Sequence, residues 1–255
     1  MLKIVYPICC GIDVHKTFVV ACIAITDNKG ITTYKRHRFS TFTQGLRELL
    51  QWLELFSCFD VCMESTGKYW IPVYNILEPS VNITLAHPKY VKAIRGKKTD
   101  TKDAQWIAEL FKHDLIAGSF MPPLAIRELR DLMRYRFKLT NFASSEKNRF
   151  QNSLTVSNIQ IASVVSDTFG KSALKIIERI LEDPEQSMLT AEELESLIHG
   201  RLIKKLPELE LAVDGFITPE QKIKLKIIKE HFDALTLCKK TLRRNYPRTR
   251  PALPK

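Results

Sequence analysis

The sequence lacks the patterns of a zinc-clip protein, a membrane protein and an exported protein. Its six cysteines form no CxxC pair, show no recurrent spacing and have no adjacent pair of histidines, which argues against a structural zinc site. The longest apolar run, residues 18–25, is far shorter than the roughly 20 residues of a membrane-spanning helix. The apolar run at the N-terminus meets Asp13 too early for a signal peptide. We therefore expect a cytoplasmic protein with reduced cysteines and no membrane partner.

Acidic residues are in deficit relative to basic ones. The chain has 28 Asp and Glu against 39 Lys and Arg, a formal net charge of +11. Both halves share the excess, with 15 basic and 11 acidic residues up to position 120 and 24 and 17 after it. A positive balance of this size favours a polyanionic partner. Nucleic acid, and DNA first, is the leading candidate.

Strand and helix patterns alternate in the first 120 residues. Runs rich in Val, Ile, Cys and Phe predict strands at residues 3–12, 17–26, 31–39, 59–63 and 81–86. Apolar residues at helical spacing predict helices at about residues 46–56, 69–77 and 101–115. Three strands, a helix, a strand, a helix, a strand and a further helix is the order of the ribonuclease H-like fold. We therefore expect an α/β domain with a mixed sheet, in which the first and fourth strands lie side by side.

Strand patterns almost vanish after this region. Helical apolar spacing recurs at residues 126–154, 172–181, 190–198 and 219–244. We expect residues 1–120 to form the α/β domain, residues 121–245 an all-α, coiled-coil-like region, and residues 246–255 a basic, proline-containing tail. The apolar stripe of the last helix predicts pairing with another copy of the chain, and hence a homo-oligomer.

Four carboxylates interrupt this basic chain at particular places. Asp13 and Glu64 lie at the ends of predicted strands, and Asp100 and Asp103 open a predicted helix. Each alone has an ordinary explanation, since acids start turns and are favoured at helix N-termini. Together they are suited to hold two Mg²⁺ or Mn²⁺ ions roughly 4 Å apart, which would clamp the attacking and leaving oxygens of a phosphodiester. Basic side chains near them are predicted to contact nucleic-acid phosphates, namely Lys16, Lys68, Arg95, Lys97, Lys98 and Lys102.

Four motifs over about residues 8–120 resemble those of a known family. They are GIDVHK at residues 11–16, MESTGKYW at 63–70, HPKYVK at 87–92 and KTDTKDA at 98–104. In this order they are similar to the DEDD transposases of insertion sequences, the IS one-ten group that includes Piv-type invertases. The resemblance implies a RuvC-like catalytic domain in which Asp13, Glu64, Asp100 and Asp103 bind divalent metal and act in DNA cleavage and exchange. It also implies a coiled-coil-like segment after that domain and, in some members, a structured guide RNA.

The resemblance does not extend over the whole family pattern. The family carries a further C-terminal domain with a serine nucleophile, and we find no such segment before Lys255. We therefore expect a truncated transposase. Two alternatives stay open: a catalytically incomplete protein that only binds nucleic acid, and a stand-alone RuvC-like junction nuclease. Cleavage of branched DNA by the chain alone separates the nuclease from the other two.

Overall fold

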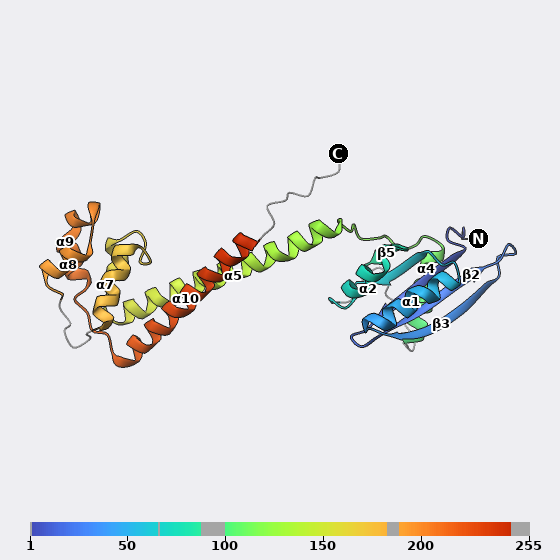
Figure 1. Ribbon diagram of the computed structural model, residues 1–255, viewed down its shortest axis with the longest axis horizontal. Coiled ribbons are helices and arrows are strands. Elements are labelled where there is room, and N and C mark those ends of the chain that lie inside the picture. The colour runs from blue at the N-terminus through green and yellow to red at the C-terminus, as the bar shows by residue number, and fades with distance from the viewer. Residues whose placement is uncertain (1, 66, 88–99, 183–188, 246–255) are drawn as a thin grey trace. The chain divides into compact units, whose positions relative to one another are not determined.

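The computed structural model describes residues 2–65, 67–87, 100–182 and 189–245, with residues 100 and 101 described by their backbone only. The chain forms two compact units, Met1–Pro122 and Pro123–Lys255, whose elements are labelled in Figure 1. Each unit has its own core of buried apolar side chains. The predicted tail, residues 246–255, lies outside the described residues. No helix in the described part of the chain is long and apolar enough to cross a membrane.

A five-stranded mixed sheet forms the first unit. Its strands are β1 (Ile8–Val14), β2 (Phe18–Thr26), β3 (Thr32–Ser40), β4 (Asp60–Glu64) and β5 (Asn82–Ala86). They lie in the order β3-β2-β1-β4-β5. The β1–β2 and β2–β3 pairs are antiparallel, whereas β1–β4 and β4–β5 are parallel. The predicted α/β domain with a mixed sheet is confirmed, with the first and fourth strands as neighbours.

Strand β1 begins at Ile8, five residues later than the apolar run predicted. The reason is Pro7, which has no backbone N–H and is poorly tolerated in a central strand paired on both sides. Before it, the backbone N–H groups of Val5 and Tyr6 donate to the carbonyl oxygen of Lys112, at 2.9 and 3.1 Å. The N-terminal segment therefore contacts the last turn of helix α4 instead of extending the sheet.

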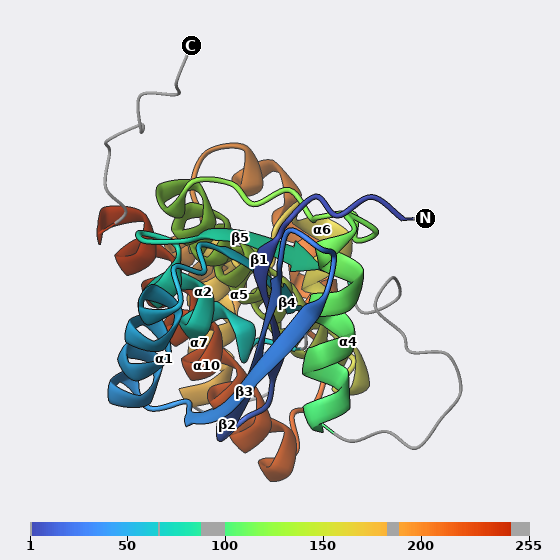
Figure 2. The ribbon, with the colours of Figure 1, turned by 90° about the vertical axis from the view of Figure 1, so that its right-hand side faces the viewer.

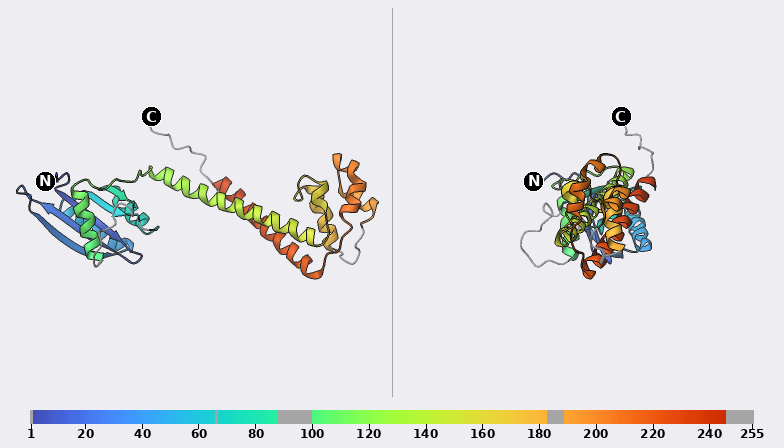
Figure 3. Two further views of the ribbon diagram at one scale, coloured as in Figure 1. Left: turned by 180° about the vertical axis from the view of Figure 1, so that it is seen from behind. Right: turned by 90° about the vertical axis from the view of Figure 1, so that its left-hand side faces the viewer.

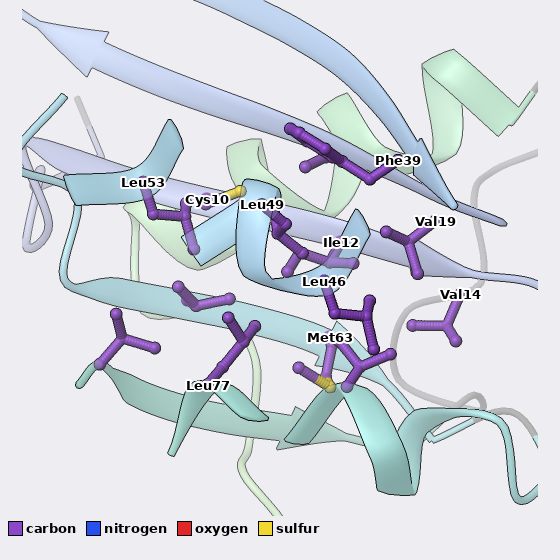
Figure 4. Close-up of a cluster of buried hydrophobic side chains, with 14 of the residues drawn as sticks. Cys10, Ile12, Val14, Val19, Phe39, Leu46, Leu49, Leu53, Met63 and Leu77 are labelled. Carbon is purple, nitrogen blue, oxygen red and sulfur yellow. The ribbon is translucent and has the colours of Figure 1, made fainter. Parts of the chain in front are cut away.

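Helices cover both faces of this sheet. Helices α1 (Thr43–Leu55) and α2 (Trp70–Leu77) lie on one face, and α4 (Asp100–Lys112) lies on the other, as Figure 2 shows for α1 and α4. Because side chains alternate along a strand, β1 and β4 each contribute to both cores. Ile12 and Met63 point into the α1 side together with Leu46 and Leu49 (Figure 4). Both faces of the central strands are thus buried.

Two long helices dominate the second unit. Helix α5 (Leu124–Val156) packs along α10 (Pro219–Asn245), and the two ribbons lie side by side in Figures 1 and 3. Leu139 packs with Leu235, while Ser153, further along α5, hydrogen-bonds to Gln221, nearer the start of α10. The two helices therefore run in opposite directions. The shorter helices of this unit are α6 (Ile161–Val164), α7 (Lys171–Glu182), α8 (Ala191–Leu197), η1 (Gly200–Lys205) and α9 (Leu206–Ala212).

The apolar stripe of α10 is divided between two environments. Leu225, Ile228 and Leu235 are buried inside the unit. Ile223 and Ile227, on the same helix, are about 60% exposed. Helix α5 and the short helices therefore bury much of the apolar stripe from which self-association was predicted. Ile223 and Ile227 belong to the part of the stripe that stays exposed.

Candidate functional site

The ends of β1 and β4 bring two of the predicted acids next to each other. Ile12 of β1 pairs with Met63 of β4 in parallel register, and Asp13 and Glu64 are the next residues of the two strands. Neighbouring strands lie about 4.8 Å apart. Both acids are on the α4 face, because the alternate residues Ile12 and Met63 point into the core on the α1 side. The structure therefore brings Asp13 and Glu64 side by side.

Helix α4 packs directly on β1 because position 11 has no side chain. A Cβ atom built on Gly11 would lie 2.3 Å from the carbonyl oxygen of Ala104 and 2.4 Å from the nitrogen of Ala108, far inside van der Waals contact. Nearby, the Cys9 Sγ donates to the carbonyl oxygen of Ala108 at 3.6 Å. Only glycine allows the two backbones to approach this closely.

The contacts of α4 also give its direction. Val5 meets Lys112, Cys9 meets Ala108, and Gly11 meets Ala104. The helix thus runs antiparallel to β1, and its N-terminus lies at the end of β1 that carries Asp13. Four helical residues rise about 6 Å, and two strand residues rise about 6.6 Å. The first turn of α4, one turn before Ala104, is therefore level with Asp13, two residues after Gly11.

A polar network fixes the other end of α4 to the sheet. The Tyr34 hydroxyl on β3 donates to the Glu109 carboxylate, and the buried Lys112 Nζ donates to the same carboxylate at 2.8 Å. Lys112 Nζ also donates to the hydroxyl of Thr32 at 3.2 Å. Burial raises the pKa of Glu109, but the hydrogen bonds from Lys112 and Tyr34 outweigh burial and hold that pKa below its usual value. These bonds hold α4 on the sheet and so help to position its acidic first turn.

Asp13 has a close partner within its own segment. The His15 Nε2 lies 3.0 Å from the Asp13 Oδ2, and the side chains are 34% and 13% exposed. The His15 ring also packs on Phe18, with ring centroids 4.4 Å apart. The sequence analysis did not select His15 as a site residue. The sequence contained the indication, because residues two positions apart at the end of a strand project from the same face, which puts His15 beside Asp13.

The structure describes the other predicted site residues to different extents. Asp103 is partly exposed in the first turn of α4, and the Asp100 side chain is not described. Among the side chains that are described, no three His, Cys, Asp or Glu residues lie close enough to hold a metal ion. Lys16, Lys68 and Lys102 are exposed. The remaining predicted phosphate contacts, Arg95, Lys97 and Lys98, lie outside the described residues.

All six cysteines are free in the structure. Five of them are buried, and Cys238 on α10 is exposed. Burial raises the pKa of Cys9, Cys58 and Cys62 to about 12, which keeps these thiols protonated. They pack as small apolar side chains within the sheet unit.

Comparisons with solved structures give weak likenesses. RuvC from Thermus thermophilus aligns with a TM-score of 0.34 and 13% identity, covering 44% of this chain and 99% of RuvC. The same protein in complex with Holliday junction substrate gives 0.31 and 12%, with the same coverage. The Fowlpox virus resolvase in complex with substrate Holliday junction DNA gives 0.27 and 13%, covering 41% of this chain and 72% of the resolvase. A search of curated proteins finds no match.

A family comparison is decisive. The model of the IS110-type DEDD family, described as a transposase, matches residues 10–159, which is more than half of the chain. The matched range begins just before Asp13, contains all four acids and extends through α5. This chain therefore belongs to the DEDD transposase family of the IS110 group, as its four motifs predicted.

Proposed function

We propose that this protein cleaves and exchanges DNA strands as an insertion-sequence transposase, with divalent metal held by Asp13, Glu64, Asp100 and Asp103. The observation that carries this proposal is the close packing of α4 on Gly11. It brings the first turn of α4 level with the neighbouring ends of β1 and β4. In this proposal the helix would add Asp100 and Asp103 to the two acids of the strand ends, Asp13 and Glu64.

The donor set fits a hard divalent cation. Carboxylate oxygens are the ligands that Mg²⁺ and Mn²⁺ prefer. When bound, the metal would polarise a phosphodiester and stabilise the attacking and leaving oxygens. The hydrogen bond between His15 and Asp13 would restrict the rotation of the Asp13 carboxylate and so help to orient it as a ligand. Without a cation the four carboxylates would repel one another, so we expect metal to stabilise the folded chain.

Basic residues lie close in sequence to the proposed ligands. Lys16 follows β1, Lys68 follows β4, and Lys102 lies in the first turn of α4. All three side chains are exposed. These positions suit contacts with the phosphates on either side of the cleaved bond. The proposal extends to Arg95, Lys97 and Lys98 from the sequence alone. DNA is the proposed substrate, a structured guide RNA is a further proposed partner, and the cytoplasm is the proposed place of action.

The helical unit is proposed to bind nucleic acid and a second copy of the chain. Its two long helices carry exposed apolar side chains, namely Tyr135 and Phe137 on α5 and Ile223, Ile227 and Leu237 on α10. They also carry many basic residues, among them Arg130, Arg134 and Arg136 on α5 and Lys239, Lys240 and Arg243 on α10. We assign residues 1–120 to metal-dependent cleavage, residues 121–245 to self-association and nucleic-acid contact, and residues 246–255 to the basic tail.

Thermal unfolding with and without Mg²⁺ or Mn²⁺ tests the metal centre. At about 100 times its dissociation constant, a bound ion should stabilise the chain by roughly 2.7 kcal/mol. Asp13→Asn should abolish this gain. Asp60→Asn is the matched control, because Asp60 lies at the opposite end of β4 from Glu64. The proposal fails if metal stabilises none of the three proteins, or if Asp13→Asn responds like the wild type.

Cleavage assays then test the reaction itself. The wild-type chain is incubated with Mg²⁺ or Mn²⁺ and either a four-way DNA junction or linear duplex DNA. Cleavage that Asp13→Asn abolishes supports the proposal. Cleavage of the junction alone, with no strand exchange, would indicate a junction nuclease. Tight DNA binding without cleavage under any of these conditions would indicate a protein that only binds nucleic acid.

A further inference from the structure

A row of paired residues connects the β3 edge of the sheet to the acidic site. Arg38 of β3 pairs with Val20 of β2, and Val20 pairs with Asp13 of β1. Directly paired residues of antiparallel strands project from the same face of a sheet. Arg38 therefore lies on the α4 face, the face of Asp13. Two strand spacings separate their backbones by about 10 Å.

Aromatic contacts hold the Arg38 guanidinium toward this site. Its Cζ lies 3.7 Å from the centroid of the Phe18 ring. The same ring packs against His15, which bonds to Asp13. Stacking on an aromatic ring fixes the plane of a guanidinium and leaves its N–H edge available for a ligand. Arg38, Phe18, His15 and Asp13 thus form one continuous set of contacts.

Arg38 differs from the basic residues next to it. Arg36 is on the same face, but its guanidinium donates to the Gln105 side chain on α4 and is engaged within the fold. Lys35 is on the opposite face of β3, because side chains alternate along a strand. Arg38 is exposed, and among the described residues its guanidinium has the Phe18 ring contact but neither a hydrogen-bond acceptor nor an ion-pair partner. An oriented cation of this kind is suited to an external anion.

We infer that Arg38 forms a phosphate-binding subsite that takes one phosphodiester of the DNA strand entering the acidic centre. A guanidinium matches the geometry of a phosphate with two parallel N–H···O bonds. A phosphate bound here would lie on the α4 face, where the backbones of Arg38 and Asp13 are about two strand spacings, or roughly 10 Å, apart. Arg38 would therefore fix the strand beside the cleaved bond. This inference rests on the proposed function and adds a residue outside its set of basic contacts.

The salt dependence of DNA affinity tests the subsite in the full chain. The probe is a fluorescein-labelled linear DNA duplex at a fixed Mg²⁺ concentration, and the variants are Arg38→Gln and Lys35→Gln. Each phosphate contact contributes about 0.9 to the slope of log K against log salt concentration. We expect Arg38→Gln to reduce the slope by about that amount and Lys35→Gln to leave it unchanged. Equal slopes for the two variants would overturn the subsite.

Two further variants distinguish the loss of a phosphate contact from an effect on folding. Arg38→Lys keeps the charge and should keep the slope, while weakening affinity through loss of the planar fork. Phe18→Leu keeps the apolar contact but removes the ring, and should weaken affinity without changing the number of charges. If Arg38→Lys and Phe18→Leu both bind like the wild type, Arg38 is not an oriented ligand. If the wild type shows no salt-dependent DNA binding, the proposed function fails. If the wild type binds DNA with a salt-dependent affinity and Arg38→Gln has the same slope as Lys35→Gln, the subsite alone fails.

Discussion

Replacing Gly11 with alanine should separate α4 from β1. The added Cβ would lie 2.3 Å from the carbonyl oxygen of Ala104, whereas ordinary contacts begin at 3.4 Å. The difference, about 1.1 Å, has to come from movement of backbone, because the two closest atoms belong to the backbone of α4. Overpacking of this kind typically destabilises a fold by about 1–3 kcal/mol. The helix that moves is the one that carries Asp100 and Asp103.

The same displacement should reduce activity beyond its effect on stability. A misplacement of about 1 Å in a catalytic constellation lowers a rate by roughly 100-fold. We therefore expect Gly11→Ala to remain folded at moderate temperature, to bind metal more weakly and to lose about 100-fold in DNA cleavage. Urea unfolding measures the stability, and metal titration followed by thermal unfolding measures the site.

Gly118→Ala provides the matched control. A Cβ at Gly118 would meet only the Thr84 Cγ2 atom, at 3.1 Å, which requires a shift of a few tenths of an ångström by a side chain. Neither glycine has a positive φ, so backbone strain does not distinguish the two substitutions. If Gly11→Ala is as stable and as active as Gly118→Ala, the close approach of α4 does not position the site.

Three other predictions concern stability, reactivity and pH. Leu225→Ala should lower the free energy of unfolding by about 2–5 kcal/mol, because Leu225 is fully buried. Ile227→Ala, at an exposed position of the same helix, should change it by less than about 0.5 kcal/mol. Chemical denaturation of the two variants measures both effects. Only Cys238 should react quickly with a thiol reagent in the native protein, so rapid labelling of Cys238→Ser would show that the buried thiols are accessible. Because the pKa of Glu109 is lowered in the folded state, its hydrogen bond from Lys112 stabilises the protein above the unfolded carboxyl pKa and is lost as pH falls through the folded pKa. Glu109→Gln should therefore flatten part of the acid-side loss of stability, and an unchanged pH profile would contradict this reasoning.

Local patterns in the sequence were sufficient for the elements and for the family. Alternating and helical apolar spacing depends on residues within one turn or one strand, so it predicted the helix at 219–244 and the strand at 17–26 closely. The four motifs identified the family, because each is a short string that needs no folding to be recognised. The positions of Asp13 and Glu64 at strand ends followed from the same local patterns.

Tertiary structure decided how these elements meet. The pairing of β1 with β4 joins residues about fifty positions apart, and the direction of α4 over β1 depends on the missing side chain at Gly11. Strand β1 begins only after Pro7, because a proline is poorly tolerated in a strand that is paired on both sides. No local pattern shows that β1 has a neighbour on each side. Alternation along the predicted strand puts Arg38 and Lys35 on opposite faces, but only the register across three strands places Arg38 on the face of Asp13. The sequence by itself therefore determined which acids and which elements this protein has, and the non-local contacts of the fold decided which of them lie together.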